Sequence, residues 1–118
     1  TNYAAADVDA ACALLGKAGL RPQVMIDVSH ANSSKQHQRQ MEVAADVAAQ
    51  VAAGDARITG LMIESHLEEG RQDIVAGQPL KAGVSVTDAC ISMAQTVPVL
   101  QLLAAAVRAR RALPPAAV

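Results

Sequence analysis

The chain has 118 residues, 52% of them hydrophobic and 18% charged, and its formal net charge is −1. These totals are typical of one globular domain and exclude a disordered chain. The near-neutral charge gives no basic surface for nucleic acid or an anionic membrane, and Tyr3 is the only aromatic residue on which a base could stack. No apolar run approaches the roughly 20 residues of a membrane span. We therefore expect neither a nucleic-acid partner nor a membrane partner.

Cysteine usage and the first residues of the chain indicate the compartment. Cys12 and Cys90 share no short metal-binding or redox spacing, so we predict two reduced, buried thiols. The first residues lack the basic and apolar regions of a secretory signal peptide. Because free thiols are typical of a reducing compartment, we expect a soluble, cytoplasmic protein.

The first half of the chain predicts a helix, a strand and a second helix. Residues 5–18 carry apolar side chains at helical spacing. Residues 23–29, QVMIDVS, are mostly apolar, as in a largely buried strand. Residues 33–54 place apolar side chains on one helical stripe, and we expect Ser33 or Ser34 to cap the start of that helix.

The second half predicts two strands separated by a long loop. Residues 57–65, RITGLMIES, form another apolar run with a polar end. Residues 66–83 contain several turn signals and no sustained helical period, so we expect a loop with one short helix or hairpin at most. Residues 84–90, VSVTDAC, predict a third short strand that also ends in polar residues.

A helix is expected over residues 96–113, with Thr96 as its cap and Pro98 in its first turn, where proline is tolerated. The tail LPPAAV, residues 113–118, is expected to fray. The full order is helix, strand, helix, strand, loop, strand, helix. Apolar strands that are joined by crossovers imply an α/β fold of parallel strands with both faces covered.

Each predicted strand ends in a side chain that can bind a metal ion, namely His30, Glu64 or Asp88. Because the carboxyl ends of parallel strands lie on one edge, we expect these three residues to meet. One imidazole and two carboxylates suit Mn²⁺, Fe²⁺, Co²⁺ or Zn²⁺ better than Cu(I), and such a cation could polarise a carbonyl or orient a water. The alternative is structural: strands end at the surface, where polar residues are common.

Other polar residues near these strand ends are weaker candidates. Asp27 lies inside its strand and needs a neighbouring strand or a backbone donor as partner. His66 could support Glu64 from the same loop, whereas His37 is expected to be solvated. Lys35 and Ser33 could meet an anion at a helix start, although capping alone explains the serine.

Three strings carry a specific resemblance. VMIDVSHANSSKQ, GLMIESHLEEGRQ and VSVTDACISM resemble, in order and spacing, the last part of the class I 3-deoxy-D-arabino-heptulosonate 7-phosphate (DAHP) synthases. The resemblance covers nearly the whole chain. It is looser in the closing helix, where the family usually carries an aromatic and acidic residues in place of MAQT.

The resemblance implies a TIM (β/α)₈ barrel, of which residues 1–118 would be the last three strands and their helices, without the N-terminal strands. It implies a transferase that opens the shikimate pathway by an aldol-type condensation of phosphoenolpyruvate with erythrose 4-phosphate. His30, Glu64 and Asp88 would be its catalytic metal ligands, with a divalent metal as cofactor. The family's fourth ligand is a cysteine from an early strand, which neither Cys12 nor Cys90 matches.

Two interpretations of such a chain differ in function. It could be a fragment of the synthase that is inactive alone, since a barrel of this kind needs about 250 residues and the family's Lys-Pro-Arg-Thr motif lies upstream. It could instead be a non-catalytic α/β half-barrel that binds a partner chain or a divalent metal. A third possibility is an unrelated small metal-binding α/β protein. Open strand edges favour association, and we expect a homo-oligomer.

Overall fold

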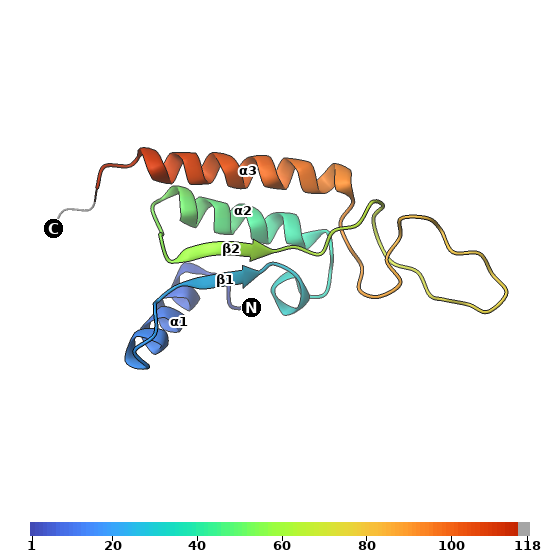
Figure 1. Ribbon diagram of the computed structural model, residues 1–118, viewed down its shortest axis with the longest axis horizontal. Coiled ribbons are helices and arrows are strands. Elements are labelled where there is room, and N and C mark those ends of the chain that lie inside the picture. Colours follow the sequence, from blue (N-terminus) through green and yellow to red (C-terminus); the bar gives the residue numbers. More distant parts are fainter. Residues whose placement is uncertain (116–118) are drawn as a thin grey trace.

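The computed structural model describes residues 1–115 and has a mixed α/β architecture (Figure 1). Its elements follow the predicted order except for the third strand. They are α1 (Ala5–Lys17), β1 (Val24–Asp27), the short 3₁₀ helix η1 (His30–Ser33), α2 (Arg39–Ala52), β2 (Ile58–Met62) and α3 (Met93–Ala112). No helix among these is long and apolar enough to cross a bilayer.

The two strands form a small parallel sheet, with Val24 opposite Ile58 and Asp27 opposite Met62. Ile26 and Val28 are buried, whereas Met25, which alternates with them, is 65% exposed. One face of the sheet is therefore covered and the other is open. The prediction that both faces would be covered is wrong for this part of the chain, because the buried apolar side chains of α1, α2 and α3 all belong to one core, which includes Ile26 and Val28 but not Met25.

That core joins all three helices to the covered face of the sheet. Figure 1 shows α2 and α3 side by side and α1 next to β1. Valine and alanine fill most of the space, as expected for a chain with one aromatic residue. The buried members are Val8, Cys12, Ile26, Val28, Val43, Ala44, Val47, Ala48, Val51, Ile58, Val99 and Ala106. Both cysteines are free and buried, as predicted.

The start of the second helix differs from the prediction. Helix α2 begins at Arg39, and neither Ser33 nor Ser34 caps it. The backbone is left-handed at Ser34 (φ 54°) and Lys35 (φ 58°), a conformation that cannot continue into a right-handed helix. The stretch predicted as the first helical turns, residues 33–38, is thus the end of η1 followed by a turn.

The third predicted strand is also absent from the described residues. Residues 84–91 form only isolated bridges, to Ser65, Gly70 and Arg71, and these bridges alternate between parallel and antiparallel. No continuous ladder can form because successive residues pair with separate points of the preceding loop. The bridge between Ile91 and Ser65 still attaches this segment to the end of β2.

Helix α3 begins three residues before the predicted start. Ser92 is its cap: the Ser92 hydroxyl accepts from the backbone N–H of Gln95, and the Gln95 side chain accepts from the N–H of Ser92. Thr96, the predicted cap, lies inside the helix and donates its hydroxyl to the Ser92 carbonyl. The reciprocal hydrogen bonds between Ser92 and Gln95 form a capping box. Residues 113–115 are not helical, and the rest of the predicted tail, 116–118, lies outside the described residues.

Candidate metal centre

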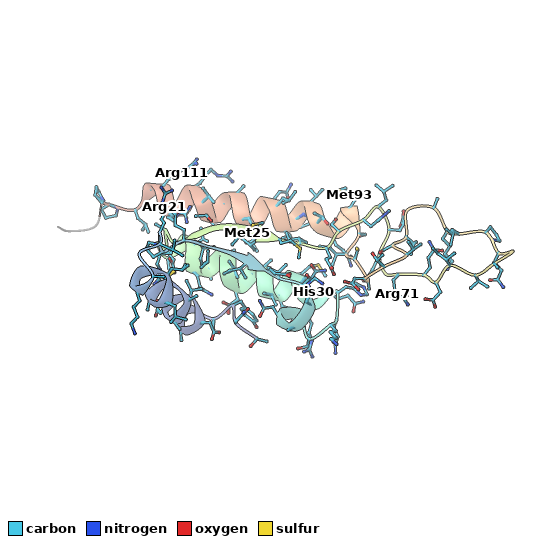
Figure 2. All side chains as sticks on the ribbon, turned by 60° about the horizontal axis from the view of Figure 1, so that its bottom comes forward. Arg21, Met25, His30, Arg71, Met93 and Arg111 are labelled. Carbon is cyan, nitrogen blue, oxygen red and sulfur yellow. The ribbon has the colours of Figure 1, made fainter. Side chains whose placement is uncertain are left out.

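His30 is the first residue of η1 and lies three residues after the end of β1 (Figure 2). Its backbone is left-handed, with φ 53°, which is uncommon for a residue other than glycine. Two hydrogen bonds hold it: its carbonyl accepts from the Lys35 N–H at 2.9 Å and from the Ser33 hydroxyl at 3.2 Å. Strain of this kind is often found at functional sites, where the surroundings fix one conformation.

Glu64 follows β2 and is fixed through its backbone by a buried glutamine. The Gln40 side chain, 1% exposed, accepts from the Glu64 N–H at 2.8 Å and donates to the Glu64 carbonyl at 3.1 Å. The same carbonyl also accepts from the Ile91 N–H at 3.0 Å. We did not predict this role for Gln40 from the sequence, because a glutamine in a polar helix start usually faces solvent.

Asp88 lies in the segment that was predicted as the third strand. The segment is tied to the site from both sides: Ile91 bridges to Ser65, and the Arg71 guanidinium donates to the Thr87 carbonyl at 3.0 Å. The loop, rather than a strand, therefore delivers Asp88 to the edge where β1 and β2 end.

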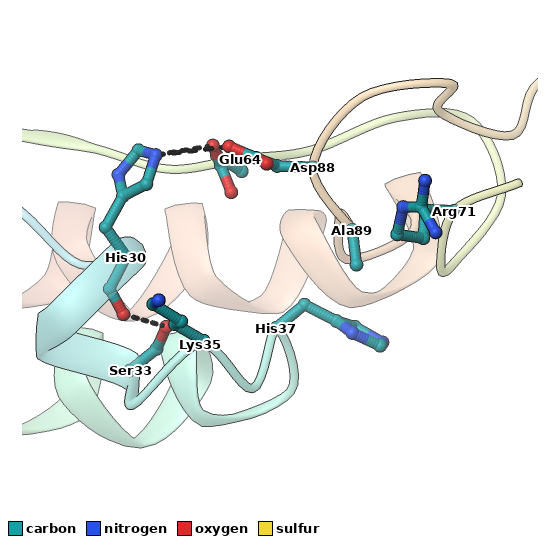
Figure 3. Close-up of a pocket in the computed structure, with 8 residues that line it drawn as sticks. All are labelled: His30, Ser33, Lys35, His37, Glu64, Arg71, Asp88 and Ala89. Carbon is teal, nitrogen blue, oxygen red and sulfur yellow. Dashed lines mark hydrogen bonds and ion pairs between the residues drawn. The ribbon is translucent and has the colours of Figure 1, made fainter. Parts of the chain in front are cut away.

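The three predicted ligands meet. His30 Nε2 lies 3.3 Å from Glu64 Oε1 and 3.2 Å from Asp88 Oδ2 (Figure 3). One ligand atom from each residue lies within 4.8 Å of the other two. Ligands at about 2.1 Å from a tetrahedral ion lie about 3.4 Å apart, so these spacings fit a metal ion with little rearrangement. Neither cysteine belongs to this group.

The charges of the three side chains also suit a cation. The hydrogen bond to Asp27 and the negative charge of Glu64 raise the pKa of His30 above its ordinary value. Partial burial raises the pKa of Glu64; the His30 charge opposes this shift, and the neighbouring Asp88 carboxylate adds to it. Two carboxylates that repel each other beside one imidazole form a donor set that a divalent cation would stabilise.

Asp27 lies behind His30 and contacts its other ring nitrogen. Asp27 Oδ2 is 2.9 Å from His30 Nδ1, and Asp27 Oδ1 accepts from both the backbone N–H, at 2.8 Å, and the hydroxyl of Ser29. Partial burial works to raise the pKa of Asp27, but the hydrogen bonds with Ser29 and His30 outweigh it and lower the pKa. The predicted backbone partner is confirmed, whereas the contact with His30 was not anticipated.

The metal-binding group lies in a cleft of about 310 Å³ (Figure 3). Its lining includes three basic side chains, those of Lys35, His37 and Arg71. His37 pairs with Glu69 at 2.9 Å and Arg71 with Asp73 at 2.7 Å, so Lys35 alone of the three has no acidic partner within residues 1–115. The full lining is His30, Ser33, Lys35, His37, Glu64, Arg71, Asp88 and Ala89.

His66 does not reach this cleft. It is exposed, and its Nδ1 accepts from the Leu67 N–H at 2.9 Å. The structure thus places only one of the two flanking histidines, His37, beside the metal-binding group.

Comparison with known proteins identifies the family. The family model described as the DAHP synthetase I family matches residues 1–101. The chain belongs to the DAHP synthetase I family. The resemblance of the three strings is therefore confirmed, and an unrelated small metal-binding protein is excluded.

Several DAHP synthases of different organisms match over most of the chain. The Phe-sensitive phospho-2-dehydro-3-deoxyheptonate aldolase of Escherichia coli strain K12 is 54% identical over 110 residues, which are 93% of this chain and 31% of that protein. The tyrosine-inhibited enzyme of Schizosaccharomyces pombe is 54% identical over 114 residues, with the same coverage of 93% and 31%. A Phe-sensitive and a tyrosine-inhibited enzyme are therefore equally similar to this chain.

A solved DAHP synthase structure has the same fold over this segment. The enzyme from Francisella tularensis superposes with a TM-score of 0.88 and 45% identity, covering 93% of this chain and 32% of that one. The chain thus spans about a third of the length of the relatives that it matches.

Proposed function

We propose that this chain forms the metal-binding part of a DAHP synthase, which condenses phosphoenolpyruvate with erythrose 4-phosphate to give DAHP and phosphate, the first step of aromatic amino acid biosynthesis. Membership of the DAHP synthetase I family supports the reaction. The observation that carries the proposal is the convergence of His30, Glu64 and Asp88, whose ligand atoms lie within 4.8 Å of one another.

His30, Glu64 and Asp88 would hold the cation through one nitrogen and two carboxylate oxygens. Mn²⁺, Fe²⁺, Co²⁺ and Zn²⁺ all accept such a set. When bound there, a divalent cation supplies Lewis-acid polarisation of an aldehyde oxygen or orients a water. Asp27 keeps the His30 ring in place from behind, at 2.9 Å from its Nδ1.

The basic side chains of the cleft fit phosphorylated substrates. Lys35 carries a charge with no acidic partner within the described residues, and Arg71 lies on the far wall of the same cleft. A cleft that combines a cation-binding group with ammonium and guanidinium groups favours small anionic ligands. Phosphoenolpyruvate and erythrose 4-phosphate are both of this class.

We infer that catalysis needs further strands of a (β/α)₈ barrel beyond this chain. The His30 side chain is 54% exposed and that of Asp88 is 68% exposed, so the site is open to water, whereas condensation chemistry requires a closed site. The open sheet face that carries Met25 would then face the barrel interior. The two buried free cysteines and the biosynthetic role are consistent with a cytoplasmic enzyme.

A chimera would test the proposed function. We expect the Phe-sensitive enzyme of Escherichia coli to remain active when its matching segment is replaced by this chain, because the two are 54% identical there and a solved relative at 45% identity keeps the same fold over this segment. Phosphoenolpyruvate consumption would be followed by its ultraviolet absorbance. The 118-residue chain assayed alone should show only background consumption.

The matched control is the same chimera with Asp88→Asn, which removes one proposed ligand from an exposed loop without disturbing the core. It should fold but lose turnover. A folded chimera that turns over equally well with and without Asp88→Asn would contradict the proposed role of the site.

The alternative, a non-catalytic half-barrel that binds another chain, is favoured by the open surfaces of the molecule. Its radius of gyration is 17.0 Å, whereas a compact domain of this length has about 13 Å. Met25, Val97 and Leu100 are among its exposed large apolar side chains. Such surfaces favour association.

We therefore expect the chain to form dimers or larger assemblies at micromolar concentration. Light scattering coupled to size-exclusion chromatography would give the mass. A well-folded monomer across that range would rule out association through the open sheet face, and it would leave the metal-binding role to be judged by the chimera.

A further inference from the structure

We propose that Asp27 is a positioning residue that fixes the tautomer of His30, so that Nε2 carries the lone pair that faces Glu64 and Asp88. The inference rests on the proposed metal site and adds an explanation of why Nε2, and not Nδ1, is the ligand atom of His30. It is carried by the hydrogen bonds behind His30, which leave Nδ1 with acceptors only.

Both neighbours of His30 Nδ1 act as acceptors. Asp27 Oδ2 lies 2.9 Å away and the Ser29 hydroxyl oxygen also lies 2.9 Å away. The Ser29 hydroxyl has committed its own proton to Asp27 Oδ1, so it can only accept from the ring. Nε2 also faces acceptors, the carboxylate oxygens of Glu64 and Asp88, but its contacts are longer than the two 2.9 Å contacts of Nδ1. The shorter contacts favour the proton on Nδ1, and the neutral imidazole then has its lone pair on Nε2.

Nε2 is the nitrogen that points at the two carboxylates, at 3.2 and 3.3 Å. A histidine that binds a metal through one nitrogen commonly donates its other N–H to a carboxylate, which fixes the ring and makes the ligand more basic. The Asp27–His30 pair has this arrangement, and it is built locally, since only three residues separate the two side chains.

Ser29 determines which way an amide would lie at position 27. Asp27 Oδ1 accepts two hydrogen bonds, from the backbone N–H and the hydroxyl of Ser29. In Asp27→Asn the amide oxygen must occupy that place, because an NH₂ group there would face two donors. The NH₂ group would then face Nδ1 and force the ring proton onto Nε2, the wrong tautomer for binding.

This orientation predicts an unusual order of effects. Asp27→Asn and Asp27→Ala remove the same charge, but only the asparagine imposes the wrong tautomer. We expect Asp27→Asn to weaken Zn²⁺ binding by about 10–100-fold and Asp27→Ala to weaken it less. A purely electrostatic role would make the two variants equal, and a packing role would make alanine the worse one.

The experiment uses the 118-residue chain and Zn²⁺ as the probe. Affinity would be measured by competition with a chelator, and the protonated ring nitrogen of His30 by long-range ¹H–¹⁵N NMR on metal-free protein in alkaline buffer. We expect Nδ1–H in the wild type and Nε2–H in Asp27→Asn. Asp46→Asn is the matched control, since that exposed carboxylate only accepts from Gln50 within α2, and it should change neither readout.

The inference is overturned if Asp27→Asn retains Nδ1–H, or if it binds Zn²⁺ as well as Asp27→Ala does. The tautomer is read without metal, so the role of Asp27 is decided even if the wild-type chain binds no Zn²⁺. A wild-type chain that binds no Zn²⁺ would contradict the proposed metal site but not the role of Asp27 in fixing the tautomer.

Discussion

Replacing His30 with alanine is expected to lower the affinity of the chain for Zn²⁺ by more than about 100-fold, because loss of a ligand should exceed the 10–100-fold effect of losing a residue behind it. His30 supplies the only nitrogen of the metal-binding group. Without it, two carboxylates remain, of which Asp88 is 68% exposed and free to turn toward solvent. Isothermal titration calorimetry with Zn²⁺ would measure the loss.

His66→Ala is the matched control for this variant. His66 lies two residues after Glu64 in the chain, yet its ring bonds to the Leu67 N–H and does not line the cleft. We expect Zn²⁺ affinity within about twofold of the wild type, since the substitution touches no ligand. Equal losses in His30→Ala and His66→Ala would indicate nonspecific binding by surface histidines.

The same titration should depend on pH in a defined direction. The pKa of His30 is raised, chiefly by its hydrogen bond to Asp27 and by the charge of Glu64. The proton on Nε2 competes with the metal below that pKa, so affinity should be full above it and fall as the pH drops through it. Displacement of one proton gives a loss of about tenfold per pH unit below the pKa. An affinity that stays constant across this range would contradict binding through His30.

The meeting of His30, Glu64 and Asp88 could be predicted because parallel strands bring their carboxyl ends to one edge. His30 and Glu64 lie just after β1 and β2, as expected. Asp88 reaches the same edge for a different reason: the predicted strand is a loop, and it is held there by the bridge between Ile91 and Ser65 and by the hydrogen bond from Arg71 to the Thr87 carbonyl. A short polar segment can thus occupy a strand position without forming a ladder.

The details that the sequence did not reveal are conformational. The left-handed backbone of Ser34 and Lys35 has no glycine to indicate it, and the serines there were interpreted as caps. The Ser92 cap was missed although its partner Gln95 stands three residues later, the spacing of a capping box. The contact between Asp27 and His30 depends on the turn after β1, which periodicity does not describe.

Gln40→Met is expected to destabilise the fold by about 2–4 kcal/mol. The substitution keeps the length of the side chain but removes both bonds to the backbone of Glu64. The partly buried N–H of Glu64 would lose its acceptor, which costs about 1–3 kcal/mol. Its carbonyl would lose one donor and keep the Ile91 N–H at 3.0 Å, which costs about 1 kcal/mol more. Urea denaturation followed by circular dichroism, at one fixed protein concentration, would measure the change.

Gln101→Met controls for the chemical change, because Gln101 is exposed on α3 and its replacement should alter stability by less than about 0.5 kcal/mol. A second readout separates packing from positioning. Gln40 holds the backbone that carries Glu64, so Gln40→Met should also weaken Zn²⁺ binding. Residues that support a metal ligand change affinity by about tenfold or more, and we expect a loss of about tenfold. The affinity would be measured under conditions where the variant is still folded. A variant that loses stability but binds Zn²⁺ as the wild type does would show that Gln40 only stabilises α2, and that Glu64 is held in place by Ile91 alone.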